Sequence, residues 1–379
     1  MFARLWYSER LRIWSSQLLL LMLVLGAATW IWSSTTANLS KRGIRFGMDF
    51  LFAQANIPIS ESIVSYSPTD TFLWAYWVGM TNTLFISALA VVLSTLLGVL
   101  VALARRSDHL LLSGITGGFV TLVRNIPLIV HLLFWYALAT TALPAPRNAW
   151  SPVEGVYFSL RGIYVPRIEL GPYGGWFLLA GVALVPLSWL AARLAMGIGP
   201  VRTWALALGL YATAISALWL ALGIDPALGF PALRGLNFTG GARLSAEFIS
   251  LMVGLVLYTS VFIGEIIRGG IDAVPKGQWE AGRALALSER QTLSRIIAPQ
   301  ALRVIIPPLT SQYLSTVKNS TLAIAVGFPE LSLVMNTVIN QTGQAIESVL
   351  ILLAAFLTVS LSVSLSMNCY NRRLALVTR

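Results

Sequence analysis

Eight apolar runs, separated by shorter polar segments, follow one another along the chain. Most of them approach or exceed the length of about 20 residues with which a helix crosses the hydrocarbon core of a bilayer. The runs cover residues 18–32, 81–104, 119–143, 176–196, 203–224, 246–267, 304–328 and 348–367. The pattern predicts an all-α fold, a polytopic transmembrane helical bundle of about eight spans.

The first run raises the question of a cleavable signal peptide, because Arg4, Arg10 and Arg12 precede it. A secretory signal ends in a small-x-small cleavage site. This run instead ends in Trp30 and Trp32, and tryptophan is typical of a membrane interface. We expect the run to be retained as the first span.

The composition agrees with a membrane protein: 56% of the residues are apolar and only 11% are charged. The formal net charge of +11 would also suit a nucleic-acid-binding protein, but that function requires cations gathered on one solvated face. Here they lie in short clusters between apolar runs. The single cysteine, Cys369, cannot form an internal disulfide, and we expect it to be an inert residue of a membrane helix.

The cations also predict the orientation, because cytoplasmic segments of membrane proteins are enriched in Lys and Arg. With a cytoplasmic amino terminus, the inner cations are Arg4, Arg10, Arg12, Arg105, Arg106, Arg124, Arg193, Arg202, Arg268, Lys276, Arg283, Arg290, Arg295, Arg303, Arg372, Arg373 and Arg379. The outer ones are Lys41, Arg42, Arg45, Arg147, Arg161, Arg167, Arg234 and Arg243, and Lys318 falls within a span. The inner majority predicts that both termini are cytoplasmic.

Two outer segments, residues 33–79 and 144–175, are too polar and too rich in Pro and Gly to face lipid. We expect them to be extracytoplasmic loops or short surface helices.

The segment between the sixth and seventh runs is charged and carries two helix signals. Pro275 and Gly277 precede a helix-favouring stretch at 278–287. Ser288 and Gln291 have the spacing of a capping box that would start a second helix, and Pro299 would end it. Two short amphipathic helices just below the membrane predict a surface on which a partner docks.

This segment resembles the cytoplasmic EAA loop of importer-type ABC permeases, in particular the polar amino-acid branch. The matching stretches are 265–271 (EIIRGGI), 274–281 (VPKGQWEA), 283–285 (RAL), 299–303 (PQALR), 307–308 (PP) and 318–322 (KNSTL). Two upstream stretches, 79–84 (GMTNTL) and 122–128 (LVRNIPL), are similar to the same branch. The chain length and the additional pair of runs resemble the longer general L-amino-acid permeases.

The resemblance implies that the loop fits a cleft on an ATPase subunit, with Glu280 as the acidic contact. The coupling residues would be Gln278, Trp279, Glu280, Ala281, Gly282, Arg283 and Ala286. The chain departs from the usual pattern at Gly282, Ala286 and Ala298. Ala286 stands where relatives often have a glycine for the turn, and alanine adopts a positive φ poorly.

For the whole chain, the resemblance implies an ABC importer permease (MetI-like) architecture in the bacterial inner membrane. Residues 1–78 would form an N-terminal span and an extracytoplasmic segment, 79–367 the permease domain, and 368–379 a cytoplasmic tail. The permease domain would include the extra span pair 176–224 and the EAA loop 268–303. The implied partners are a second permease subunit, identical or paralogous, a dimer of ATPase subunits and a soluble solute-binding protein.

Several polar residues lie within or next to predicted spans, where they are costly and often functional. They could form a path for an amino acid: Asn82, Thr83, Glu265, Lys318, Asn319, Ser320 and Thr321. Glu265 would hold the ammonium group, so its loss should slow the uptake of cationic amino acids most. In the structural alternative, Glu265 extends towards the interface and Lys318 satisfies backbone carbonyls near Pro307 and Pro308.

Three classes of function compete. The first is the permease of an ATP-driven importer, and the second is an ion-gradient-driven secondary transporter or channel, which often shows repeats and intramembrane acidic ion sites. The third is a membrane-embedded enzyme, but the spans carry no hydrolase or metalloprotease motif. The chain also lacks the G-x-x-x-x-G-K-[ST] phosphate loop. We therefore expect no cofactor, metal or catalytic residue here, and ATP and Mg²⁺ on a separate ATPase.

Overall fold

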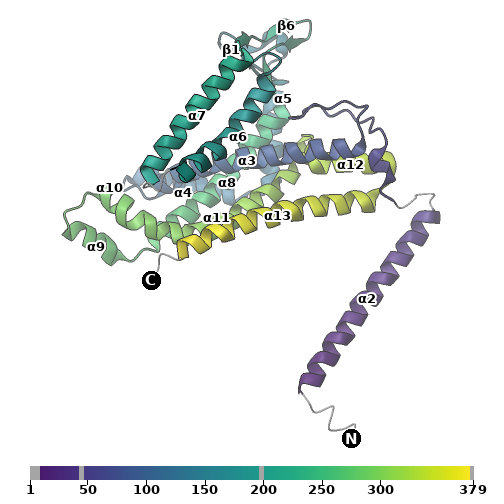
Figure 1. Cartoon of the computed structure of the whole chain (residues 1–379), viewed down its shortest axis with the longest axis horizontal. Helices are drawn as coiled ribbons and strands as arrows, with labels where there is room; N and C mark the ends of the chain where they lie inside the picture. The colour runs from purple at the N-terminus through teal and green to yellow at the C-terminus, as the bar shows by residue number, and fades with distance from the viewer. Residues whose placement is uncertain (1–8, 42–46, 196–199, 376–379) are drawn as a thin grey trace. The chain divides into compact units, whose positions relative to one another are not determined.

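The computed structural model describes residues 9–41, 47–195 and 200–375, and it is built mainly of long helices (Figure 1). The chain forms two compact units, one made of Met1–Leu132 with Met252–Arg379 and the other of Leu133–Leu251. The cations Arg4, Arg42, Arg45 and Arg379, the last residue of the predicted span 176–196 and the side chain of Cys369 lie outside the described parts.

The first unit consists of helices. In chain order they are α2 (Glu9–Lys41), η1 (Asp49–Phe52), α3 (Phe72–Arg105), α4 (Leu110–Asn125), the start of α5 (Leu128–Thr141), most of α8 (Ala246–Asp272), α9 (Lys276–Ala284), α10 (Glu289–Thr292), the π-helical turn η3 (Leu293–Ile297), α11 (Ala298–Asn319), η4 (Ser320–Val326), α12 (Leu331–Thr342) and α13 (Ala345–Ala375).

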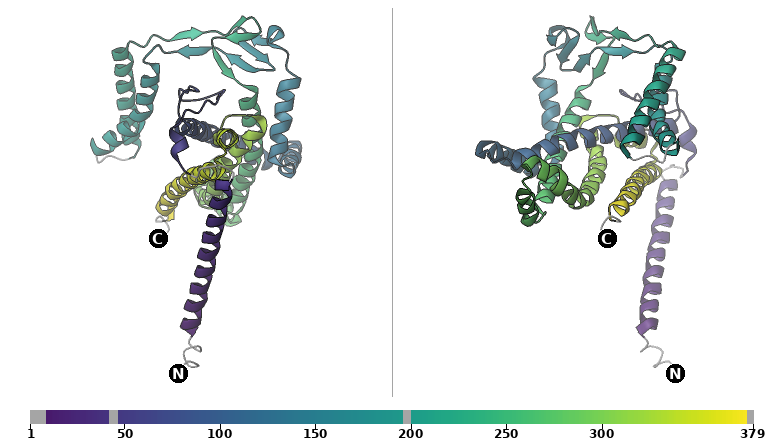
Figure 2. Two further views of the ribbon diagram at one scale, coloured as in Figure 1. Left: turned by 90° about the vertical axis from the view of Figure 1, so that its right-hand side faces the viewer. Right: turned by 60° about the vertical axis from the view of Figure 1, so that its left-hand side comes forward.

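The second unit combines short strands with a helical hairpin. It contains η2 (Pro146–Asn148), β1 (Trp150–Val153), β2 (Val156–Ser159), β3 (Gly162–Val165), β4 (Arg167–Glu169), α6 (Gly174–Ala195), α7 (Pro200–Leu222), β5 (Ala227–Gly229), β6 (Ala232–Arg234), β7 (Asn237–Thr239) and β8 (Ala242–Leu244). The strands form an antiparallel sheet of order β1-β2-β3-β8 and two antiparallel pairs, β4-β5 and β6-β7. Helices α6 and α7 lie side by side and extend from the strand layer (Figures 1 and 2).

The predicted number of spans is confirmed. Within the described residues, six helices are long and apolar enough to cross a membrane, and two sharply bent helix pairs raise the number to eight if each pair is one span. One bent pair is α4 with α5, at 103°. The bend lies at Pro127, directly before α5, where the missing N–H of proline is tolerated. The other pair joins α10, α11 and η4 to α12 at 51°, and α12 was not predicted.

The outer segment 144–175 was predicted to be loops or surface helices, and this prediction is wrong because β1 to β4 lie there. Its core is aromatic: Tyr164 is 2% exposed and its hydroxyl donates to Asn237 Oδ1 at 2.7 Å. The ring of Phe238 stacks on Tyr157 at 4.5 Å. Strands β1, β2 and β3 form hairpins of neighbouring segments, whereas β3 also pairs with β8, which lies far away in the sequence and has no local signal.

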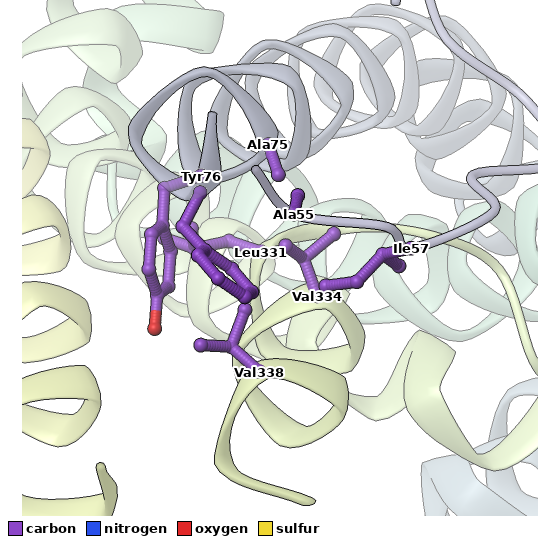
Figure 3. Close-up of a cluster of buried hydrophobic side chains, with 8 residues drawn as sticks. Ala55, Ile57, Ala75, Tyr76, Leu331, Val334 and Val338 are labelled. Atoms are coloured by element: carbon purple, nitrogen blue, oxygen red, sulfur yellow. The ribbon is translucent and has the colours of Figure 1, made fainter. Parts of the chain in front are cut away.

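The polar segment before the second span is shorter than predicted. Helix α2 continues to Lys41, and α3 begins at Phe72, where the side chain of Thr71 caps it by accepting from Trp74 N. The intervening chain contains η1 and an extended stretch. Ala55 and Ile57 from this stretch pack against Tyr76 of α3 and Leu331 of α12 (Figure 3).

Small residues allow α3 and α8 to approach closely. A Cβ on Gly98 would lie 2.6 Å from Cγ2 of Ile263, and a Cβ on Gly264 would lie 2.7 Å from Cγ1 of Val101. Such contacts are typical of membrane helices. Because lipid is as apolar as the helix surface, no hydrophobic force drives helices together, and close backbone approach provides van der Waals attraction instead.

The sequence suggested that Pro299 ends the second short helix of the loop 268–303, but it does not. It lies in the first turn of α11, immediately after the π-helical turn η3. A π-type turn changes the local hydrogen-bond register, so the missing N–H of a proline fits there without ending the helix. Helices α10, η3 and α11 therefore follow one another without a break in the chain.

Candidate functional site

The segment between the sixth and seventh apolar runs contains two short helices, α9 and α10, as the sequence predicted. The capping box of α10 is present: Ser288 Oγ accepts from Gln291 N at 3.3 Å, and Gln291 Oε1 accepts from Ser288 N at 3.0 Å. Both orphan donors at this helix start are thereby satisfied. Helix α9 ends at Ala284, three residues before the predicted end.

The turn between the two helices forms although it lacks the usual glycine. Ala286 adopts a φ of +53°. The N–H of Leu287 donates to Gly282 O at 3.1 Å and that of Ala286 to Arg283 O at 2.9 Å, which is a Schellman arrangement. The left-handed conformation costs alanine roughly 1 kcal/mol or more, because its Cβ crowds the carbonyl.

Gly282, another departure from the usual pattern, is explained by packing. A Cβ there would lie 2.6 Å from Cγ2 and 2.7 Å from Oγ1 of Thr292 on α10. Because Gly282 has no side chain, α9 lies directly against α10. The two helices therefore form one compact element.

The predicted coupling residues divide into an exposed set and an anchoring set. Glu280, Ala281 and Arg283 are exposed. Gln278 is half-buried and its Oε1 accepts from Gln300 Nε2 of α11 at 3.2 Å, while Trp279 packs against a buried cluster of Ile271, Val274, Ile297, Ala301 and Ile305. Exposed charges on an anchored helix are what docking to a partner requires.

An open hollow of about 710 Å³ lies beside this helix. Its lining combines apolar side chains with charges of both signs: Leu103, Arg106, Asp108, Ile271, Lys276, Trp279, Glu280, Arg283, Glu289, Arg290 and Leu293. These residues come from the ends of α3 and α8 and from α9, α10 and η3, so the loop and two spans share one surface.

Ion pairs connect the C-terminal ends of α3 and α8. Glu265 Oε1 lies 3.4 Å from Arg105 Nε, and Glu265 Oε2 lies 2.9 Å from Arg268 Nη2. Asp272 pairs with Arg268 at 3.0 Å and also with Arg106. We call these five residues the ion-pair cluster.

Sequence reasoning named only Glu265 of this cluster as a site residue and missed Arg105, Arg106, Arg268 and Asp272. A local signal existed for part of the cluster, because Glu265, Arg268 and Asp272 have the i, i+3 and i+4 spacings at which helical side chains meet.

Two of the proposed path residues, Asn82 and Thr83, hold the break before α12. Asn82 Nδ2 donates to Pro329 O at 2.8 Å and to Glu61 O at 2.9 Å. Thr83 Oγ1 accepts from Leu331 N at 3.0 Å. A Cβ on the neighbouring Gly79 would lie 3.0 Å from Leu331 Cα. Residues 79–84 therefore hold residues 329–331, the break between η4 and α12, in a fixed position. We call this contact the seat of the break.

Glu330 completes the seat, and sequence reasoning missed it. Its side chain is 0% exposed, and Oε1 accepts from Leu333 N at 3.0 Å as the N-cap of α12. Oε2 lies 3.4 Å from Thr83 Oγ1. An acid between Pro329 and an apolar run is an N-cap signal that could have revealed it.

The remaining path residues lie at the junction of α11 and η4. Lys318 is exposed and Asn319 is half-buried, whereas Ser320 is buried and donates to Val317 O at 2.7 Å. Thr321 Oγ1 donates to Lys318 O at 2.7 Å. The structure thus separates these residues from Glu265 by most of α11, and only Lys318 and Asn319 present polar groups outward.

Acidic, His and Cys side chains do not gather into a metal-binding group of three anywhere in the described residues. The half-buried His131 contacts Val123 O at 3.2 Å through Nε2, and its ring lies edge-on to Tyr258.

Comparisons with known proteins agree with this arrangement. Residues 94–376 match the family described as "Binding-protein-dependent transport system inner membrane component". The putative amino-acid ABC transporter permease protein YhdX of Escherichia coli K12 is 44% identical over 375 residues, which cover 97% of this chain and 95% of that protein.

Two further relatives span almost the whole chain. The general L-amino acid transport system permease protein AapQ of Rhizobium johnstonii is 36% identical, covering 98% of this chain and 94% of that protein. The glutamate/glutamine/aspartate/asparagine transport system permease protein BztB of Rhodobacter capsulatus is 34% identical, covering 98% and 96%. This chain belongs to the family of binding-protein-dependent transport system inner membrane components, and it is an ABC importer permease.

Proposed function

We propose that this chain forms the translocation path of an ATP-driven amino-acid importer and receives its conformational drive through α9. The observation that carries the proposal is the exposed pair Glu280 and Arg283 on a helix anchored to the ends of α3, α8 and α11. The names of the three relatives support amino acids as the cargo. In the proposed complex, a separate ATPase dimer binds ATP and Mg²⁺, because this sequence has no phosphate loop.

The proposed complex contains a second permease, identical or paralogous, and a soluble solute-binding protein on the outer side. The test is to purify this chain from its native membrane with its untagged partners and reconstitute the complex in liposomes. Solute with its binding protein should stimulate ATP hydrolysis. Uptake driven by an ion gradient without ATP would instead favour a secondary transporter.

We propose that both termini and residues 268–303 are cytoplasmic, as the distribution of cations indicates. Single cysteines at Gly277 and at Leu160, in a chain whose Cys369 is replaced by serine, should react from opposite sides of the membrane. Both positions lie outside the candidate spans. Labelling by an impermeant maleimide is measured in intact and in permeabilised spheroplasts. Reaction of both cysteines in intact spheroplasts would contradict this topology.

For the substrate path we propose the surface around Lys318 and Asn319, because an exposed cation within a span must face a partner or a polar passage rather than lipid. The geometry of Glu265 supports its structural alternative, since Arg105 and Arg268 already compensate its charge.

We therefore expect Glu265→Gln to slow the uptake of arginine and of a neutral amino acid equally, because the change weakens the ion-pair cluster and removes no contact to the cargo. Both rates are measured in membrane vesicles and normalised to inserted protein. A loss confined to arginine would place Glu265 in the path, since a missing Coulomb partner matters most to a cationic cargo.

A further inference from the structure

We propose that Arg106 is a positioning residue that transmits the movement of α9 to α3, and through α3 to the break before α12. This inference rests on the proposed contact of α9 with an ATPase.

Arg106 connects three helices. It follows the last residue of α3, pairs with Asp272 at the end of α8, and places its guanidinium carbon 5.8 Å from the ring centroid of Trp279 on α9. Helix α9 follows α8 after only three residues, so those two helices are joined covalently. No such short link joins α9 to α3, and Arg106 supplies a direct contact between them.

The same side chain lines the hollow together with Glu280 and Arg283. A partner that docks on the exposed charges of α9 therefore approaches the guanidinium of Arg106 as well. A guanidinium group is suited to linking three helices, because it can pair with a carboxylate and stack on an aromatic face at the same time.

The ion-pair cluster connects α3 to α8 at a second point, beside the pair of Arg106 with Asp272. Arg105 pairs with Glu265, and Arg268 bridges Glu265 and Asp272, so adjacent residues of α3 are connected to α8. These side chains are partly exposed, and exposed ion pairs add little to stability. Their value lies in fixing the relative position of the two helix ends.

Helix α3 extends from this cluster to Asn82 and Thr83, which hold the break before α12. Asn82 and Thr83, on the same helix, bond to Pro329 and Leu331. A displacement of the Arg106 end of α3 is thereby passed to the junction of η4 and α12. A bent span held at one seat is an element that can adopt two arrangements, which coupling between distant sites requires.

The test uses the reconstituted complex with its ATPase and solute-binding protein. The readout is the ratio of solute-stimulated to basal ATP hydrolysis. We expect Arg106→Gln to lower this ratio at least ~5-fold, the lower end of typical coupling effects. Arg106→Lys should lose most of the effect too, since lysine keeps the charge and loses the planar stacking.

The matched control is Arg193→Gln on α6, because Arg193 also stacks on a tryptophan, Trp189 at 5.2 Å, and lies outside the loop. Its ratio should equal that of the wild type.

A wild-type ratio in Arg106→Gln, while Glu280→Lys has lost stimulation, would overturn the role of Arg106 and leave the proposed function intact. Absence of stimulation in the wild-type complex would instead remove the proposed function on which the inference rests. If Arg106→Gln fails to assemble, Arg106→Lys decides by the same ratio.

Discussion

Replacing Glu280 by lysine is expected to abolish solute-stimulated ATP hydrolysis and uptake while the chain stays inserted in the membrane. Glu280 is exposed on α9, so the change should alter the stability of the chain by no more than about 0.5 kcal/mol. A like-charge contact in a partner's cleft, by contrast, costs several kcal/mol. Stimulated hydrolysis and uptake are measured in the reconstituted complex, with inserted protein quantified alongside.

Glu280→Gln removes the attraction between residue 280 and the partner's cleft without adding the repulsion that lysine introduces. It should therefore retain part of the solute-stimulated hydrolysis. Glu154→Lys in the second unit makes the same charge change at another exposed position, and it should behave like the wild type. Full stimulation in Glu280→Lys would remove this residue from the coupling role. A chain that no longer inserts would show that the substitution acts on folding instead.

Replacing Glu330 by alanine is expected to destabilise the permease by about 2 kcal/mol, the upper end of the range for the loss of a helix N-cap. Loss of an N-cap typically costs about 1 kcal/mol. The cost here lies near the upper end for a cap, because Leu333 N loses its acceptor in a buried site, where an unsatisfied donor costs about 1–3 kcal/mol. We expect the midpoint of thermal unfolding in detergent to fall by roughly 2–5 °C, since the shift per kcal/mol becomes smaller as the chain becomes longer.

Glu330→Gln keeps an oxygen that accepts from Leu333 N, so its midpoint should lie between those of the wild type and Glu330→Ala. The control is Glu289→Ala, which truncates an exposed acid in the first turn of another helix. An unchanged midpoint in Glu330→Ala would mean that the carboxylate does not hold the break before α12. Uptake should fall with the same order of variants, because the break loses its fixed position.

The parts of the fold that were predicted from the sequence depend on neighbours along the chain. Apolar length identified the spans. Ser288 and Gln291 announced the start of α10 through their three-residue spacing. The two short helices of the loop 268–303 were recognised for the same reason, since their residues are continuous in sequence. Ala286 shows the limit of such reasoning, because the turn formed despite the missing glycine.

The features that only the tertiary structure decided join residues far apart in the chain. Pairing of β3 with β8, the seat formed by Asn82 and Thr83 for Pro329 and Leu331, and the contact of Arg106 with Trp279 have no local signature. A buried polar group must find a partner wherever the fold brings one, and the identity of that partner depends on packing rather than on spacing. The sequence by itself therefore determined the membrane class, the number of spans and the two short helices of the loop 268–303. The packing of α3 against α8 and α12 decided the rest. It determined which polar side chains are hydrogen-bonded within the protein, and which remain available to a partner or a cargo.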